Sequence, residues 1–237
     1  MATNDLGYLA ANLVAVRQRI ATAASQAGRK PADIKLVGVS KTVGREEVSE
    51  MGRLGLRDFG ENRIPEAEAR FVPSPFENKE DKISPTLHLI GHLQSNKARR
   101  AVALFDMVHS VDSLHLAQTL DRQAALHGKR LPILLQVNVS GEESKEGLPP
   151  LEVPAVVEAV LKLVHLELRG LMTIAPNLAD PQQTRPVFQG LRQLFEQHQQ
   201  LGPQWCELSM GMTNDFEVAI EEGATLIRVG RALFQPG

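Results

Sequence analysis

Cysteine is almost absent from this chain, which contains a single one, Cys206, among 237 residues. One thiol can form no internal disulfide and cannot build a cysteine-rich metal site. Such usage suits a reducing compartment, and we expect a cytoplasmic protein.

Long apolar runs and an excess of charge of one sign are also missing. No apolar run approaches the roughly 20 residues that a membrane-spanning helix needs, and no basic region precedes an apolar one at the start. The formal net charge of −2 gives no electrostatic reason to expect nucleic acid or an anionic membrane as a partner. We therefore expect a soluble protein that binds neither.

Apolar strands and amphipathic helices alternate about eight times along the chain, with short connections. Hydrophobic residues make up 43% of the sequence, enough for a full core. This alternation predicts a parallel sheet with crossover helices, and at this length a closed (β/α)8 TIM barrel is more economical than an open sheet. We expect one domain over residues 1–237. The expected strands are 34–39, 56–60, 87–91, 107–111, 131–139, 166–172, 206–210 and 224–230.

Helical spacing predicts the elements between these strands. An extra amphipathic helix over 5–27 precedes the first strand, and the polar stretch 72–86 with its three prolines reads as a surface loop. The other expected helices are 45–54, 64–71, one near 98–104, 113–127, 151–164, 183–200 and 214–222.

Lys41 follows the first apolar strand and is the first candidate functional residue. A lysine at this point keeps its stem in apolar packing while its amine reaches the carboxyl end of the strand, where sites gather in α/β folds. Its amine could form a Schiff base with a carbonyl compound. The alternative is a lysine that merely closes a strand. Two rival amines near other strand ends, Lys97 and Lys145, lie in more polar connections.

The ends of the seventh and eighth strands predict a phosphate site. Residues 209–215 supply two hydroxyls, Ser209 and Thr213, and a glycine, Gly211, that frees the backbone; after the eighth strand, Gly230 follows Arg228. Barrels commonly hold phosphate in these two loops. A helix start follows in which Asn214 and Glu217 fit a capping box, and its N-terminus would point into the site. The alternative is that Ser209 and Thr213 form an ordinary helix cap, Gly230 an ordinary turn and Arg228 a surface charge. His92 and His109 read as hydrogen-bonded loop histidines, and no metal site is expected.

Six motifs together resemble one known family. They are GVSKT at 38–42, FGEN at 59–62, HLIGHLQSNK at 88–97, GLMTIAP at 170–176, LSMGMTND at 208–215 and IRVGRALF at 227–234. The chain resembles the YggS/PROSC family of pyridoxal 5′-phosphate (PLP) homeostasis proteins over nearly its whole length. The resemblance implies a single barrel like the N-terminal domain of alanine racemase, the fold type III of PLP proteins.

The resemblance also implies roles for individual residues. Lys41 would hold PLP as an imine, with Asn62 and Met172 near the ring. Ser209 and Thr213 would bind the phosphate, as would the loop containing Gly211, and the RxG motif maps to Arg228 and Gly230. Arg228 is expected to face the ring nitrogen.

Two functions of different class follow from this reading. The first is a PLP-binding protein of vitamin B6 homeostasis that acts as a monomer, has no appreciable catalytic turnover, and hands PLP transiently to apo-enzymes. The second is a single-domain racemase-like enzyme. A barrel aldolase acting on a sugar phosphate is a third, weaker option.

The scarcity of tyrosine and cysteine favours the first function. Racemisation needs a second base on the ring face opposite the lysine, which related two-domain enzymes supply as tyrosine or cysteine. The only tyrosine here, Tyr8, lies in the first expected helix, and Cys206 is expected to be buried at the start of a strand. A positioned acid or base contributes roughly 10² to 10⁴ in rate, and we expect the chain to lack it.

Overall fold

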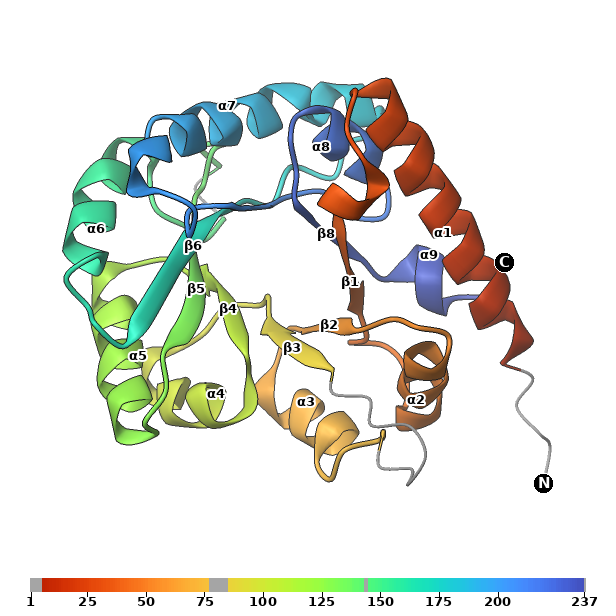
Figure 1. Cartoon of the computed structure of the whole chain (residues 1–237), viewed down its shortest axis with the longest axis horizontal. Helices are drawn as coiled ribbons and strands as arrows, with labels where there is room; N and C mark the ends of the chain where they lie inside the picture. The colour runs from red at the N-terminus through yellow and green to blue at the C-terminus, as the bar shows by residue number, and fades with distance from the viewer. Residues whose placement is uncertain (1–5, 77–84, 143–144, 237) are drawn as a thin grey trace.

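Eight parallel strands close into a barrel in the part of the chain that the structure describes. The computed structural model describes residues 6–76, 85–142 and 145–236, and Figure 1 shows the strands ringed by helices. Each strand pairs with the next in sequence order, and β8 pairs with β1. The strands are β1 Lys35–Val39, β2 Asp58–Glu61, β3 Thr86–Leu89, β4 Met107–Val111, β5 Leu131–Gln136, β6 Leu166–Met172, β7 Glu207–Ser209 and β8 Leu226–Val229. The TIM-barrel prediction is confirmed.

The pairing of β1 with β8 brings the two ends of the chain together. Val37 pairs with Arg228, and Gly38 pairs with Val229. Because all strands run in parallel, their carboxyl ends meet at one rim. The segments that follow β1 and β8 therefore lie side by side.

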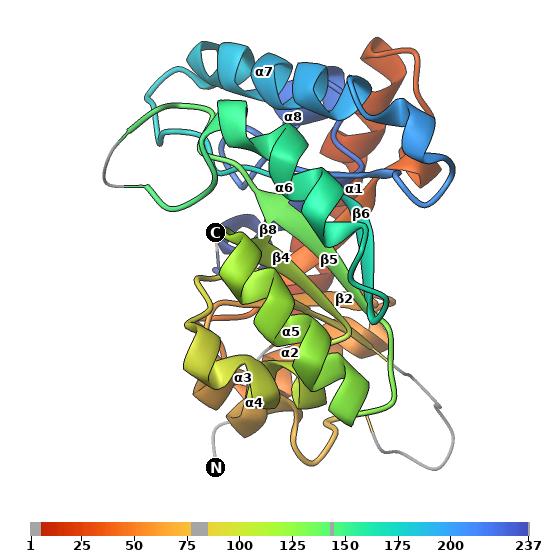
Figure 2. The same ribbon diagram turned by 90° about the vertical axis from the view of Figure 1, so that its left-hand side faces the viewer.

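The helices cover the outside of the barrel, as Figure 2 shows for α5 and α6 in front of β5. Those that follow the strands are α2 Arg45–Arg53, α3 Ile64–Phe71, α4 Ala98–Leu104, α5 Leu114–Leu126, α6 Val153–Val160, α7 Arg185–Glu196, α8 Phe216–Glu221 and α9 Arg231–Phe234. The helix expected over 64–71 begins and ends at those residues, as α3. The expected helices 151–164 and 183–200 were too long, because short 3-10 segments at Pro150–Glu152, Pro181–Thr184 and Gln199–Leu201 take up part of them.

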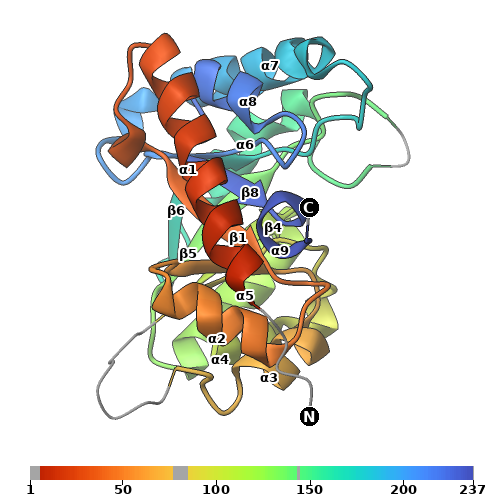
Figure 3. The ribbon, with the colours of Figure 1, turned by 90° about the vertical axis from the view of Figure 1, so that its right-hand side faces the viewer.

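The extra N-terminal helix is present as α1, Gly7–Gln26. It packs against α8, α9 and α2 and crosses the outside of β1 and β8 in Figure 3. The Asn12 amide donates to the carbonyl of Leu233 at 3.1 Å and to that of Gln235 at 2.9 Å. The helix thereby fixes the segment after β8. No helix in the described ranges is apolar over the length that a bilayer crossing requires.

Two apolar clusters make up the core. The larger lies between the strands and the surrounding helices, and the smaller consists of Val37, Met107, Leu134, Met172 and Leu226. These five residues stand on β1, β4, β5, β6 and β8, and they fill part of the barrel interior. Buried polar side chains, among them His88, His109 and Arg228, also stand on the strands.

Two sequence-based expectations need comment at this level. Cys206 is exposed, so its predicted burial is wrong; β7 begins only at Glu207, and the thiol lies outside the strand. The expected surface loop at 72–86 falls partly on residues 77–84, which lie outside the described residues.

Candidate functional site

A cavity of about 600 Å³ opens at the carboxyl-end rim of the barrel. Five of the predicted site residues line it, and they come from the segments after β1, β2 and β7, from β8, and from the residue after β8. They are Lys41, Asn62, Thr213, Arg228 and Gly230. The volume suits a small-molecule ligand, for which pockets span about 300 to 1,000 Å³.

The backbone of Lys41 is held in place by a buried carboxylate and an arginine. Ser40 donates its hydroxyl to Glu61 at 2.7 Å, and Arg70 donates to the same carboxylate at 2.9 Å. Arg70, on α3, also donates to the carbonyls of Val43 at 2.7 Å and Lys41 at 2.9 Å. The lysine side chain itself is exposed. Its main chain is therefore fixed from β2 and α3, while its side chain is accessible to solvent.

Burial governs the electrostatics of Glu61, whose side chain is fully enclosed. Desolvation raises the pKa of this carboxyl, and the hydrogen bond from Ser40 and the charge and hydrogen bond of Arg70 oppose the rise. The glutamate of the FGEN motif thus organises the loop after β1. Asn62, the next residue, is the member of the motif that lines the cavity.

Arg228 is a buried cation at the floor of the cavity, with only 4% of its surface exposed. It donates one hydrogen bond to the Ser209 hydroxyl at 2.6 Å and another to the Thr173 carbonyl at 2.8 Å. Burial lowers its pKa to about 10, and the nearby Asp215 opposes this shift. The guanidinium therefore stays charged at neutral pH in a fixed orientation.

The turn after β7 requires glycine at position 211. Gly211 has a φ of +91°, and a Cβ there would lie 2.6 Å from the Cβ of Ala219 and 2.9 Å from the Cα of Phe216. Asp215 closes this turn by accepting from the backbone N–H of Met212 at 2.6 Å. The predicted capping box is wrong: Asp215 is the N-cap residue, and Glu217 pairs with Arg19 instead.

A second arginine borders the end of the cavity formed by Thr213 and Gly230. Arg231 lines the cavity and donates to the Asn214 side chain at 3.1 Å. No Cβ at Gly230 would fit without crowding the Val39 carbonyl, at 3.3 Å, so β1 and the segment after β8 approach closely. A hydroxyl and an arginine at one end suit an anion such as phosphate.

Three predicted site residues do not line this cavity. Met172 and Ser209 are completely buried. Gly211 allows the turn after β7 but is not part of the cavity surface. Met172 points into the barrel with Met107 and Leu134, because alternate residues of a strand face opposite sides. The Ser209 hydroxyl is engaged with Arg228 and His109, which places it beneath the cavity.

The rival amines lie elsewhere. Lys97 and Lys145 are not among the residues that line the cavity, and Lys145 pairs with Glu142 at 2.7 Å. Of the three lysines, Lys41 is the one that lines this cavity.

His92, expected to be a hydrogen-bonded loop histidine, does lie in a loop and stands in the cavity wall. The Nδ1 of His92 lies 3.2 Å from a carboxylate oxygen of Asp112 and 3.2 Å from one of Glu146, and both His92 and Glu146 line the cavity. The only sequence signal was the position of His92 just after the third strand. No cluster of three metal-ligating side chains occurs within the described ranges.

Comparison with known proteins places the chain in a family. The model of the alanine racemase N-terminal domain matches residues 11–236. A pyridoxal phosphate homeostasis protein of Pseudomonas aeruginosa is 44% identical over 97% of this chain and 96% of its own. The chain belongs to the pyridoxal phosphate homeostasis protein family.

Solved structures agree with this membership. PipY of Synechococcus elongatus, a structure with PLP bound, is 38% identical, covers 95% of this chain and 99% of its own, and has a TM-score of 0.80. An alanine racemase from Bartonella henselae shares the fold alone, at 15% identity and a TM-score of 0.72, and this chain corresponds to 59% of its length. The Pseudomonas aeruginosa relative and PipY thus match over nearly their whole length, whereas the racemase has a large additional part.

Proposed function

We propose that this protein binds PLP through Lys41 and acts in vitamin B6 homeostasis without appreciable turnover of amino acids. The observation that carries the proposal is one cavity of about 600 Å³ that is lined by both Lys41 and the buried Arg228. We propose the whole chain, residues 1–237, as a single binding domain that works as a monomer in the cytoplasm, with apo-enzymes as transient partners.

The residues present fit this cofactor in chemistry as well as in volume. PLP supplies an aldehyde that condenses reversibly with a primary amine. Lys41 offers that amine, Arg228 offers donors for the ring nitrogen, and Thr213 with Arg231 offers donors for the phosphate. Each hydrogen bond that involves a charged group contributes about 1.5 to 3 kcal/mol.

The partner of the ring nitrogen argues for storage rather than catalysis. A carboxylate at that position would stabilise a protonated ring, which then accepts electrons from a bound substrate. Arg228 can only donate hydrogen bonds and stays charged, since its pKa is about 10. The ring is then a poor electron acceptor.

One observation favours the racemase-like alternative. His92 stands in the cavity wall with Asp112 and Glu146 against its Nδ1, and an imidazole so oriented could act as a base. The alternative predicts amino-acid turnover that disappears in His92→Gln. The aldolase alternative predicts a colourless protein.

Borohydride reduction of the yellow, PLP-loaded protein followed by peptide mapping tests the proposal. We expect the label on Lys41. We also expect Lys41→Ala to lose the reducible absorbance, and the control Lys97→Ala to keep it. Label on Lys97 or Lys145 would overturn the assignment. Incubation of the loaded protein with D- and L-amino acids tests the lack of turnover, and a rate of about 1 s⁻¹ or faster would contradict it.

A further inference from the structure

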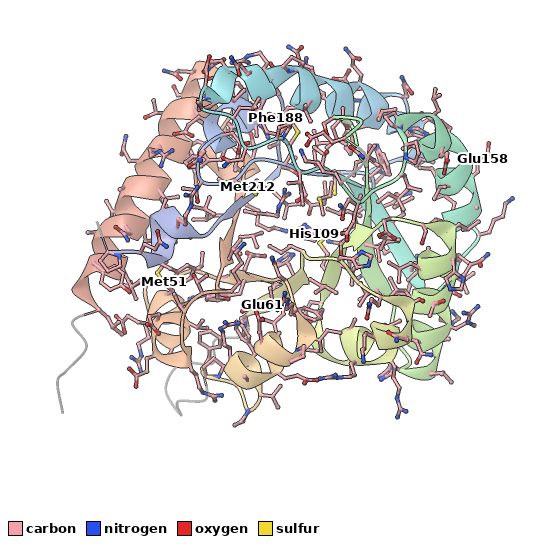
Figure 4. All side chains as sticks on the ribbon, turned by 180° about the vertical axis from the view of Figure 1, so that it is seen from behind. Met51, Glu61, His109, Glu158, Phe188 and Met212 are labelled. Carbon is pink, nitrogen blue, oxygen red and sulfur yellow. The ribbon has the colours of Figure 1, made fainter. Side chains whose placement is uncertain are left out.

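A chain of polar side chains runs through the barrel from Arg228 to the opposite end. Ser209 lies at the end of β7, His109 in β4, His88 in β3 and Asp58 at the start of β2. The first three are enclosed, with 0%, 0% and 1% of their surface exposed, and Figure 4 shows His109 among the strands. The expectation that His109 is a loop histidine is therefore wrong.

Each member of this chain is within hydrogen-bond distance of the next. Ser209 Oγ lies 2.6 Å from Arg228 Nη1 and 3.0 Å from His109 Nδ1. His109 Nε2 lies 2.9 Å from His88 Nδ1, and His88 Nε2 lies 2.9 Å from Asp58 Oδ1. The Asp58 side chain is 18% exposed, so the chain ends at solvent.

The two ends of the chain fix the direction of every hydrogen bond. A guanidinium can only donate and a carboxylate can only accept. Ser209 accepts from Arg228, and its own proton then goes to Nδ1 of His109. His109 must carry its proton on Nε2 and donate to Nδ1 of His88, which in turn donates from Nε2 to Asp58. With both imidazoles neutral, every group has a partner.

The opposite direction fails at Ser209. If His109 carried its proton on Nδ1, Ser209 would accept twice and its hydroxyl proton would have no acceptor among its recorded contacts. His88 would then have to be an imidazolium to donate to both His109 and Asp58. A buried unsatisfied donor and a buried charge are both costly.

We propose that Ser209, His109, His88 and Asp58 form a one-directional hydrogen-bonded relay that positions Arg228 at the cavity floor. These are positioning residues, because the relay acts on the ligand through Arg228. The part of this inference that concerns PLP rests on the proposed function. The relay itself does not depend on it.

The surroundings of His109 support a neutral imidazole. Burial lowers its pKa well below 6.5, and the positive charges or partial charges of His88, Arg228 and Lys35 add to the effect. The carboxylates that contact its neighbours have other partners: Asp58 contacts His88, and Glu207 contacts Lys35 at 3.4 Å. In the described part of the chain, the recorded contacts of the His109 ring nitrogens are with His88 and Ser209, and neither is a carboxylate.

The relay also explains why a serine of the seventh strand end is buried beneath the cavity. Arg228 pairs only with Ser209 and the Thr173 carbonyl among its recorded side-chain hydrogen bonds. Without the Ser209 hydroxyl as acceptor, the guanidinium would keep only its hydrogen bond to the Thr173 carbonyl and could rotate about it. Fixed on two sides, it presents its free donors to the cavity.

Nitrogen-15 NMR of histidine-labelled, ligand-free protein at pH 7 tests the relay itself. We expect His88 and His109 to be neutral with the proton on Nε2, assigned by the loss of signals in His88→Gln and His109→Gln. A proton on Nδ1 of His109, or an imidazolium at His88, would overturn the proposed direction. This measurement needs no cofactor.

The positioning effect is tested by PLP affinity. Ser209→Ala removes the acceptor, and we expect it to weaken PLP binding about 10- to 100-fold, the worth of a hydrogen bond to a charged group, and to shift the absorbance of bound PLP. Ser209→Thr keeps the hydroxyl and should restore both. Unchanged binding in Ser209→Ala would overturn the positioning role, whatever the tautomers. If the parent protein itself binds no PLP, the proposed function fails. The histidine tautomers measured by NMR would still show whether the relay exists.

Discussion

Removal of the imidazole at position 109 should change how the stability of the ligand-free protein depends on pH. Because burial depresses the pKa of His109 well below 6.5, the folded protein leaves this group neutral at pH values where the unfolded chain protonates it. The unfolded state then binds more protons, so the contribution of His109 to the free energy of unfolding falls as the pH falls below 6.5 and is steady above it.

The size of this effect follows from one proton. A group that protonates at about 6.5 only in the unfolded state lowers the free energy of unfolding by about 1.4 kcal/mol at pH 5.5 relative to pH 8. For a chain of this length, about 1.4 kcal/mol corresponds to roughly 3 to 6 °C in Tm. His109→Gln should lack this loss, although it is less stable at every pH. Burial raises the pKa values of Glu61 and Asp215, so these two groups stabilise the folded state as the pH falls. They do so in the parent protein and in His109→Gln alike, and their effect cancels in the difference between the two proteins.

Denaturant titrations between pH 5.5 and 8 measure the difference. Trp205, the only tryptophan, is 5% exposed and stacked on Phe195, so its fluorescence reports unfolding. His115→Gln, at an exposed position on α5, is the matched control and should keep the full pH dependence. Parallel pH curves for His109→Gln and the parent protein would refute a buried neutral His109.

Two further predictions concern the rim. Arg70→Ala leaves the enclosed carboxylate of Glu61 without its cation and should lower the free energy of unfolding by about 3 to 5 kcal/mol at pH 8. The loss should be smaller at pH 5, because Glu61 can take up a proton there. Equal losses in denaturant titrations at the two pH values would contradict this. Gly211→Ala should lower the free energy of unfolding by about 1 to 3 kcal/mol, because φ is +91° and the new methyl would meet Ala219. Gly230→Ala, where no positive φ is involved, should cost less, and the reverse order would refute the strain.

The sequence predicted the barrel because its strands and helices alternate with short connections, but it could not predict which face of a short strand a residue occupies. β7 has only three residues, Glu207–Ser209, so no alternation marks its inner side. Ser209, expected from the resemblance to bind the phosphate, is buried and does not line the cavity. The same limit explains Cys206, whose exposure depends on where the strand begins.

The polar interior was hidden for a different reason. In β3 the pattern Leu87-His88-Leu89 alternates, and the apolar residues face the helices while the histidine faces the barrel. A sequence shows the alternation without saying which side is the inside. The partner of His88 is on another strand, so only the closed barrel reveals that the two histidines meet.

Closure of the barrel also determines when the binding site exists. Lys41 follows β1 and Arg228 lies in β8, and these strands become neighbours only through the last pairing that closes the sheet. A ligand that needs both residues binds the closed barrel and has no equivalent site in an open one. Binding therefore stabilises the closed form by RT ln(1 + [L]/Kd), about 2.7 kcal/mol at a hundredfold excess over Kd. In this architecture, binding of a ligand that contacts both residues and cohesion of the first and last strands are thermodynamically linked.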